Sequence, residues 1–176
     1  MSENIKSLSL PLTKNDIETL RVGDVCRLSG VIYTARDAAH ARMCAMLDAG
    51  EPLPIDLNGI CIYYAGPCPA APGEVIGPCG PTTSSRMDAY APRLIGLGQT
   101  AMIGKGKRSD EVKKAMLGKA VYFAATGGAG LLIARCIKKA ELFAFPDLGP
   151  EAIWRLEVEN MPVIVAIDAS GNDITR

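Results

Sequence analysis

Short, continuous apolar runs recur along the chain and are separated by polar or helical stretches. Residues 60–65 (ICIYYA), 100–104 (TAMIG) and 119–126 (KAVYFAAT) each carry apolar side chains at successive positions. Runs of this length that are rich in β-branched and aromatic residues are typical of strands buried on both faces. Residues 24–35 (DVCRLSGVIYTA) place Val, Ile and Tyr near period two, which predicts one or two further strands.

The segments between these runs have the pattern of helices. Residues 37–49 (DAAHARMCAMLDA) combine Ala, Met and Leu, and the Thr34–Asp37 spacing predicts a capping box at the start of this helix. Helices are also predicted from Ser85 to Arg93, after Ser109, whose hydroxyl suits an N-cap, and over LLIARCIKK (131–139).

The tail adds two predicted strands, WRLEVEN (154–160) and PVIVAID (162–168). The resulting alternation of strands and helices predicts an α/β fold with a mixed, partly parallel sheet. With 176 residues, no internal repeat and no clean linker, the chain is interpreted as a single domain covering residues 1–176.

Composition and charge exclude several classes of protein. Nineteen Lys and Arg balance nineteen Asp and Glu, so the chain is not a broadly basic nucleic-acid binder. The sequence has no apolar run of the 18 residues that a transmembrane helix needs, and its N-terminus lacks the basic and apolar regions of a signal peptide. We therefore expect no membrane partner and a cytoplasmic location.

The cysteines do not have the spacing of a metal site. They contain no C-x-x-C pair, and one histidine is present in the whole chain. Dispersed cysteines of this kind are expected to be small buried hydrophobes, although Cys68 and Cys79 flank a Gly/Pro-rich stretch and could approach each other.

Four polar clusters fall where predicted strands lead into predicted helices. They are 34–40 (TARDAAH), 80–88 (GPTTSSRMD), 104–110 (GKGKRSD) and 126–130 (TGGAG). Such junctions carry the ligand sites of α/β folds. The last cluster lacks the spacing of a phosphate-binding loop, so it is interpreted as a tight strand–helix connection.

Three of these clusters place a cation early in the loop or in the first helical turn, namely Arg36, Arg86 and Lys105. Cations are disfavoured near the positive end of a helix dipole, so these positions need another justification. An anion held jointly by the cation and by free N–H groups at a helix start would provide it. Three such positions together fit a ligand with several negative groups, such as a dicarboxylate or a phosphate ester.

Plainer interpretations exist for the arginines. Arg36 would pair with Asp37 or another surface carboxylate, and Arg86 would pair with Asp88. Either pairing would satisfy the guanidinium without any ligand.

The other polar residues also have plain interpretations. Lys105 and Arg108 would belong to a solvated basic turn. Thr82 and Thr83 would be turn or N-cap hydroxyls, and His40 would be a satisfied residue at a helix interface.

Five segments resemble, in the same order, the β subunit of two-subunit class I fumarate hydratases, which corresponds to the C-terminal domain of the single-chain enzymes. These segments are TARDAAHAR (34–42), YAGPCP (64–69), GPTTSSRMD (80–88), IGKG (103–106) and the tail from Ile153 to Asp173. The β subunit of L-tartrate dehydratase shares the same framework. TGGAGLLIARCIK and EAIWRLEVENMP are more similar to the fumarase branch, which favours fumarate.

The resemblance implies a swivelling β/β/α domain and reversible hydration of fumarate to L-malate. In this family a [4Fe-4S] cluster is held by three cysteines of the α subunit, and its open iron acts as a Lewis acid. None of the six cysteines here matches those ligands, so no metal is expected on this chain. Its expected partners are a fumarase α subunit, over whose cluster it closes, and a dicarboxylate substrate; self-association of the isolated chain stays open.

The resemblance also assigns residue roles. Arg36, Arg86 and Lys105 match the family's contacts to substrate carboxylates, and a guanidinium can grip a carboxylate with two parallel hydrogen bonds. Thr82 matches the residue proposed to take the C3 proton of malate. A threonine hydroxyl is a poor base unless nearby cations or a carboxylate of the α subunit assist it.

Three further residues are expected to support these contacts. Asp37 and His40 match motif positions and would orient Arg36, and Thr83 lies beside Thr82. A different class of function, a phosphohistidine carrier, would use the lone His40. Its predicted place on an amphipathic helix disfavours that function, because a carrier histidine should be exposed on a loop.

Overall fold

Seven strands form one mixed sheet in the computed structural model, which describes residues 4–125 and 129–175. The strands are β1 (Lys6–Ser9), β2 (Val25–Thr34), β3 (Cys61–Tyr63), β4 (Ala101–Gly104), β5 (Val121–Ala124), β6 (Ile137–Ala144) and β7 (Ile153–Ile167). Strands β1 to β5 run parallel to their neighbours, whereas β7 is antiparallel to β2, β5 and β6.

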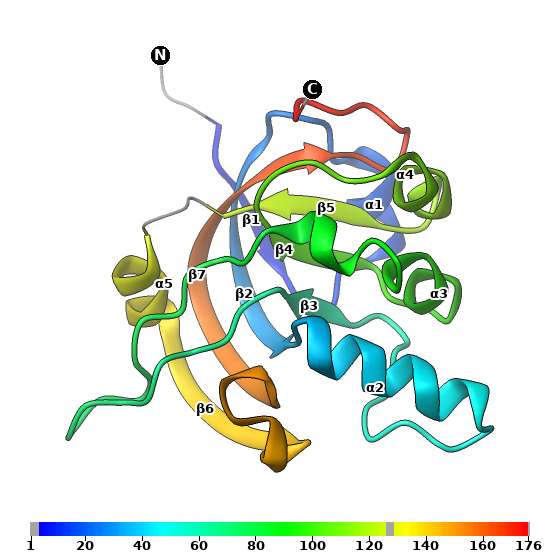
Figure 1. Cartoon of the computed structure of the whole chain (residues 1–176). Helices are drawn as coiled ribbons and strands as arrows, with labels where there is room; N and C mark the ends of the chain where they lie inside the picture. Colours follow the sequence, from blue (N-terminus) through cyan, green and yellow to red (C-terminus); the bar gives the residue numbers. More distant parts are fainter. Residues whose placement is uncertain (1–3, 126–128, 176) are drawn as a thin grey trace.

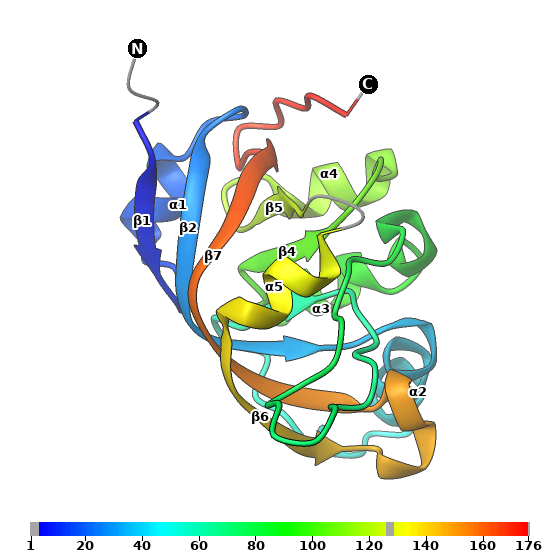
Figure 2. The same cartoon turned by 90° about the vertical axis from the view of Figure 1, so that its left-hand side faces the viewer.

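Five of the strands close into a ring. Strand β2 pairs with β3 on one side and with β7 on the other, and β7 also pairs with β5. The ring β2-β3-β4-β5-β7 is therefore a small barrel, with β1 and β6 attached outside it (Figures 1 and 2). The predicted α/β class and mixed sheet are confirmed; the closure was not predicted, and the swivelling arrangement stays a prediction.

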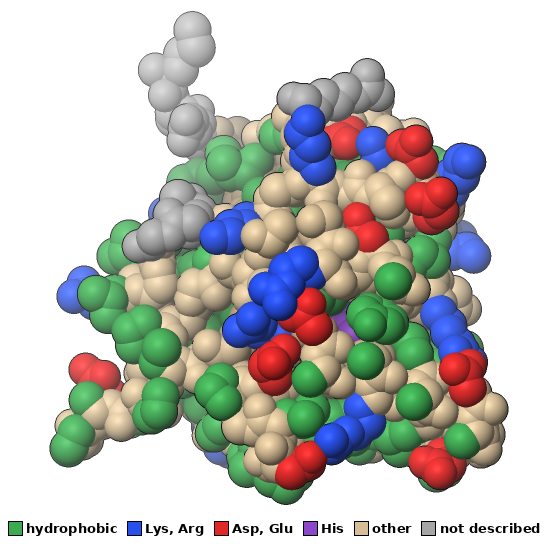
Figure 3. Space-filling view, viewed as in Figure 1, with side chains coloured by type: hydrophobic (Ala, Val, Ile, Leu, Met, Phe, Trp, Pro, Cys, Tyr) green, Lys and Arg blue, Asp and Glu red, His purple; other side chains and the backbone are tan. Residues whose placement is uncertain are grey.

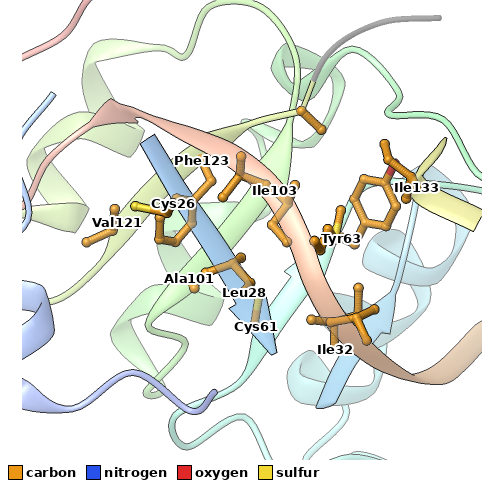
Figure 4. Close-up of a cluster of buried hydrophobic side chains, with 14 of the residues drawn as sticks. Cys26, Leu28, Ile32, Cys61, Tyr63, Ala101, Ile103, Val121, Phe123 and Ile133 are labelled. Atoms are coloured by element: carbon orange, nitrogen blue, oxygen red, sulfur yellow. The ribbon is translucent and has the colours of Figure 1, made fainter. Parts of the chain in front are cut away.

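The short barrel strands are buried on both faces, as their continuous apolar sequences predict. Alternate residues point into the barrel, where Cys61 and Tyr63 of β3 meet Ile103 of β4 and Phe123 of β5 (Figure 4). The residues between them point outward and join a second core under the helices. This outer group includes Ile62, Tyr64, Met102 and Tyr122.

Helices cover the outside of the barrel on the side of the outer core. The α-helices are α1 (Lys14–Thr19), α2 (Asp37–Asp48), α3 (Ala91–Gly96), α4 (Asp110–Met116) and α5 (Gly130–Cys136), with 3-10 turns η1 (Ser84–Met87) and η2 (Pro146–Glu151). Helices α2, α3 and α4 lie together at the right of Figure 1, and α5 lies apart at the left. None of the described helices is long and apolar enough to cross a membrane.

Two predictions about helix starts need correction. Thr34 does not cap α2: its hydroxyl donates to Ala152 O and accepts from Trp154 N, which ties β2 to β7, and the N-cap is Arg36. The helix predicted from Ser85 to Arg93 is instead η1 followed by α3, because Pro92 starts a new helix. By contrast, Ser109 caps α4 as predicted, accepting from Val112 N.

The second half of the chain contains more strand than predicted. The predicted helix over 131–139 ends at Cys136, and β6 follows because it can pair with β7 along its length. The two tail strands are one strand, β7. Pro162 is tolerated inside it because the pairing of β7 with β6 stops at Val158 and its pairing with β5 starts at Ile164, so that β7 has only β2 beside it there.

Candidate functional site

The three cation-bearing loops meet at one edge of the barrel, where β2, β3 and β4 end. Thr82 N–H donates to Tyr64 O over 2.6 Å, and Ser84 N–H donates to Lys105 O over 2.9 Å. Thr83 and Lys105 also form an isolated parallel bridge. The loops 34–37, 80–86 and 104–107 therefore lie on one side of the molecule.

Two glycines allow this close approach. A Cβ on Gly104 would overlap with Ser84 Oγ, so β4 can end against η1 only with glycine there. A Cβ on Gly66 would lie 3.1 Å from Arg36 Nη1 and 3.0 Å from Pro150 O. Glycine at these positions therefore sets how closely the loops and the Arg36 side chain pack.

Asp37 lies between the two arginines of the site. Arg86 Nε donates to Asp37 Oδ1 over 3.0 Å, so the predicted pairing of Arg86 with Asp88 is wrong. Arg36 Nε lies 4.0 Å from Asp37 Oδ2 and 3.9 Å from Glu151 Oε1, which are ion-pair distances without a hydrogen bond. Basic and acidic side chains gather in the middle of this face (Figure 3).

The plain interpretation of Arg36 as an ordinary ion pair is therefore incomplete. Its Nε is buried and has no hydrogen-bond acceptor among the described residues, and the buried Asp37 Oδ2 has no hydrogen-bond donor there. A buried donor without an acceptor is costly, typically by about 1–3 kcal/mol. The site thus holds polar groups with unused hydrogen-bonding capacity.

The expected placement of the three cations at helix starts needs partial correction. Only Arg36 lies at the start of a long helix, and there Glu151 Oε1 already accepts the Ala38 N–H over 3.4 Å. Arg86 lies within η1, and Lys105 lies in the loop before α4. The cations are brought together by the barrel edge and not by three separate helix N-termini.

The threonines do not have the predicted capping role. Thr83 is the N-cap of η1, but its side chain makes no capping hydrogen bond. Thr82 is half-buried, and its backbone N–H is bonded to Tyr64 O. Lys105, whose backbone pairs with Thr83, is exposed, as is half of the Arg86 side chain. The Thr82 loop and the cationic loops are therefore open to a ligand.

His40 is a buried residue on α2. A ring nitrogen, Nδ1, lies 2.8 Å from Arg36 O, to which it donates, and the other nitrogen has no partner among the described residues. The ring lies edge-on to Tyr64, and burial lowers its pKa to about 4. The prediction of a satisfied interface residue therefore holds for Nδ1 but not for Nε2. Full burial of the ring argues against a phosphohistidine carrier.

We expect the stability of the folded chain to depend on His40 below neutral pH. The unfolded chain binds this proton near the ordinary pKa of 6.5 and the folded chain near pKa 4, so the unfolded state holds more protons between these values. Through this residue, stability is largely complete above pH 6.5 and falls by about 2.5 kcal/mol between pH 7.5 and 4.5. Urea unfolding of wild type and His40→Phe at both pH values measures it; equal pH dependence would contradict the prediction.

Sequence reasoning missed the group that lies beneath the loops. Arg108, predicted to belong to a solvated turn, is buried, with Asp88 as its ion-pair partner. Its surroundings are Tyr64 and Tyr122, which point outward from the barrel. The signal available in the sequence was the pair of tyrosines in buried strands, since buried tyrosine hydroxyls need polar partners.

The described residues contain no group of three or more His, Cys, Asp or Glu side chains that could hold a metal ion. All six cysteines are free, and burial raises the pKa of Cys26 to about 11 and of Cys79 to about 12. Both behave as buried hydrophobes, as predicted, but Cys68 is exposed. Of the TGGAG cluster, residues 126–128 lie outside the described residues.

Comparisons with known proteins agree on one family. The "Fumarase C-terminus" family model matches residues 2–176. The chain is 45% identical over 170 residues to the "Putative L(+)-tartrate dehydratase subunit beta" of Methanocaldococcus jannaschii, covering 93% of this chain and 87% of that protein. It is 44% identical to "Fumarate hydratase 1, mitochondrial" of Leishmania major and 42% identical to "Fumarate hydratase class I, anaerobic" of Escherichia coli, each over 149 residues.

The length of these matches differs. The match covers 83% of this chain in both fumarate hydratases but only 27% of their length, so the chain spans about a quarter of those proteins. It spans most of the tartrate dehydratase subunit. On this family match and these identities, the chain belongs to the fumarase C-terminal family of class I fumarate hydratases and tartrate dehydratase β-type proteins.

Proposed function

We propose that this chain is the β subunit of a two-subunit hydro-lyase that adds water to fumarate reversibly and gives L-malate. The observation that carries the proposal is the cationic barrel edge, where loops bearing Arg36, Arg86 and Lys105 meet around Thr82. The single-chain relatives support it, because this chain matches only about a quarter of their length and the remainder would correspond to an α subunit.

The three cations would bind the two carboxylates of the substrate. Asp37 holds Arg86 through Nε alone, which leaves the terminal nitrogens of that half-exposed guanidinium available for a carboxylate. Arg36, with its buried unpaired Nε, would gain an acceptor when an anion binds. Fixing both ends of a planar molecule orients its double bond for addition of water on defined faces.

Thr82 is proposed to exchange the proton at C3 of malate. Its backbone is fixed to Tyr64 O at the cationic edge. Loss of the C3 proton leaves negative charge on the neighbouring carboxylate, and Lys105 and Arg86 would stabilise that charge. The same positive surroundings would favour the deprotonated hydroxyl, with a carboxylate of the α subunit as a further aid.

Asp37, His40 and Thr83 are proposed as positioning residues. Asp37 orients Arg86 directly, which differs from the expected role toward Arg36. His40 donates to the backbone oxygen of Arg36 and so holds the turn that carries this arginine. Thr83 pairs with Lys105 across the two loops and keeps that lysine beside Thr82.

The [4Fe-4S] cluster of this enzyme class is proposed to reside on the α subunit. The cysteines here do not fit it, because they are dispersed, and the described residues bring no three ligating groups together. The cluster would supply Lewis acidity toward the hydroxyl that leaves malate. This chain would bind the carboxylates, exchange the C3 proton and shield the site from bulk solvent.

A second candidate substrate is L-tartrate, which the same elimination of water converts to oxaloacetate. The 45% identity to the tartrate dehydratase subunit, against 42–44% to the two fumarate hydratases above, favours this candidate. The test is the ratio of kcat/KM for L-malate and L-tartrate in the complex with the α subunit. A ratio above one supports fumarase; a ratio below one assigns the complex to tartrate, and no turnover of either refutes the hydro-lyase.

A further inference from the structure

We propose that the buried Arg108–Asp88 pair is a clamp that positions the two loops carrying Arg86 and Lys105, so that both act on one substrate. The proposal deepens the proposed function and rests on it. Neither Asp88 nor Arg108 has a place in the reaction described above. Their contacts nevertheless reach Tyr64 after β3, β4, β5 and the start of α4.

Arg108 is buried among Tyr64, which directly follows β3, Met102 of β4 and Tyr122 of β5. Its Nε donates to Asp88 Oδ1 over 2.7 Å, and its Nη2 donates to Tyr64 OH over 3.2 Å. The guanidinium also lies 5.1 Å from the ring centre of Tyr64 and 4.9 Å from that of Tyr122. The side chain of Arg108 is completely buried, so a charged group is held under the loops in one fixed place.

Asp88 joins the far ends of the two loops. Besides pairing with Arg108, its Oδ2 accepts the backbone N–H of Ser109 over 2.6 Å. Asp88 follows η1, and Ser109 precedes α4, so this one carboxylate ties the end of the Arg86 segment to the end of the Lys105 segment. At the near end the backbones are tied by the hydrogen bond from Ser84 N to Lys105 O.

Tyr122 completes the clamp between these two ends. Its hydroxyl lies 2.9 Å from Gly106 O, which can only accept, and 2.8 Å from Ser84 Oγ. The phenol therefore donates to Gly106 and accepts from Ser84, one contact in each loop. The two segments that carry Arg86 and Lys105 are thus connected at three points: the Ser84–Lys105 backbone bond, the Tyr122 hydroxyl and the Asp88 carboxylate.

The cost of such a buried pair indicates a role beyond stability. Burial of two charges is expensive, and apolar residues of similar volume often stabilise a protein equally well. A fixed pair, however, holds flanking segments in one geometry, and binding groups work best when they are held within about 0.5 Å. We infer that Arg108 and Asp88 are positioning residues for the substrate cations.

The test compares Asp88→Asn with Asp173→Asn in the complex with the α subunit. Asp173 is also buried and accepts from Lys113 Nζ over 3.0 Å, but it belongs to the C-terminal tail and contacts neither loop. Both variants should lower Tm. Kinetics are measured at a temperature well below the Tm of either variant, and kcat is expressed per folded active site. Under these conditions only Asp88→Asn should raise KM for the dicarboxylate, about tenfold, and lower kcat.

Tyr122→Phe serves if Asp88→Asn does not fold, since it removes only the hydroxyl between the loops, and it should raise KM in the same direction. A variant with lowered Tm but wild-type kcat and KM overturns the clamp. The isolated chain gives an independent measurement, because hydrogen exchange of the Ser84 amide should rise at least tenfold in Asp88→Asn and not in Asp173→Asn. An inactive wild-type complex refutes the proposed function. The hydrogen-exchange result does not depend on activity, so it still supports or overturns the clamp in that case.

Discussion

Replacement of Thr82 by Val is expected to reduce kcat of the reconstituted complex by roughly 10²–10⁴ while KM changes little. Valine keeps the shape of threonine and removes only the hydroxyl that is proposed to exchange the C3 proton. The backbone bond from Thr82 N to Tyr64 O is preserved in this variant, so the loop keeps its place. Steady-state kinetics with L-malate and fumarate, combined with a melting curve, measure both effects.

Thr100→Val is the matched control for this variant. Thr100 is also half-buried, but it lies just before β4, at the end of the strand opposite the site, and its hydroxyl donates to Gly59 O over 3.1 Å. Loss of that bond should cost about 1 kcal/mol of stability and leave turnover normal. Near-normal kcat in Thr82→Val would remove this hydroxyl from the mechanism.

Replacement of Arg86 by Lys should lower kcat/KM by about a hundredfold, or roughly 3 kcal/mol of transition-state stabilisation. Lysine keeps the charge but cannot donate to Asp37 and grip a carboxylate with two parallel bonds at the same time. We therefore expect KM to rise and kcat to fall together, measured in the complex with L-malate.

The control here is Arg93→Lys. Arg93 is an arginine of similar exposure on α3 that pairs with Asp48 over 2.6 Å, away from the barrel edge. Because exposed ion pairs contribute only about 0–1 kcal/mol, this variant should have near-normal kinetics and stability. Equal kinetic effects of the two substitutions would show that Arg86 has no special part in substrate binding.

Local sequence patterns predicted the strands of this fold more successfully than its closure. The buried strands β3 and β5 lie within the predicted runs 60–65 and 119–126, because helices outside and a core inside both demand apolar side chains there. The pairing of β2 with β7 joins residues at least 120 positions apart, and no local pattern encodes such a contact. The strand β6 was missed for the same reason, since only its pairing with β7 distinguishes it from a helix.

The meeting of the cation-bearing loops was predictable from the sequence, but the contacts between their side chains were not. The polar clusters at strand ends did place Arg36, Arg86 and Lys105 at one edge. The partner of Arg86 is Asp37, which lies on another loop, and Arg108 is buried although it stands in a basic run. Both outcomes depend on tertiary contacts that override the preference of charged side chains for solvent.

This chain is proposed to supply half of a hydro-lyase site, and the α subunit is proposed to supply the cluster and the other half. Anaerobic iron–sulfur reconstitution of this chain alone, of the α subunit alone and of their mixture tests it, with iron content and fumarate hydration measured on each. We expect hydration to occur only in the mixture and iron to stay with the α subunit. A stoichiometric cluster on this chain alone, or a reconstituted mixture without hydro-lyase activity, would contradict it.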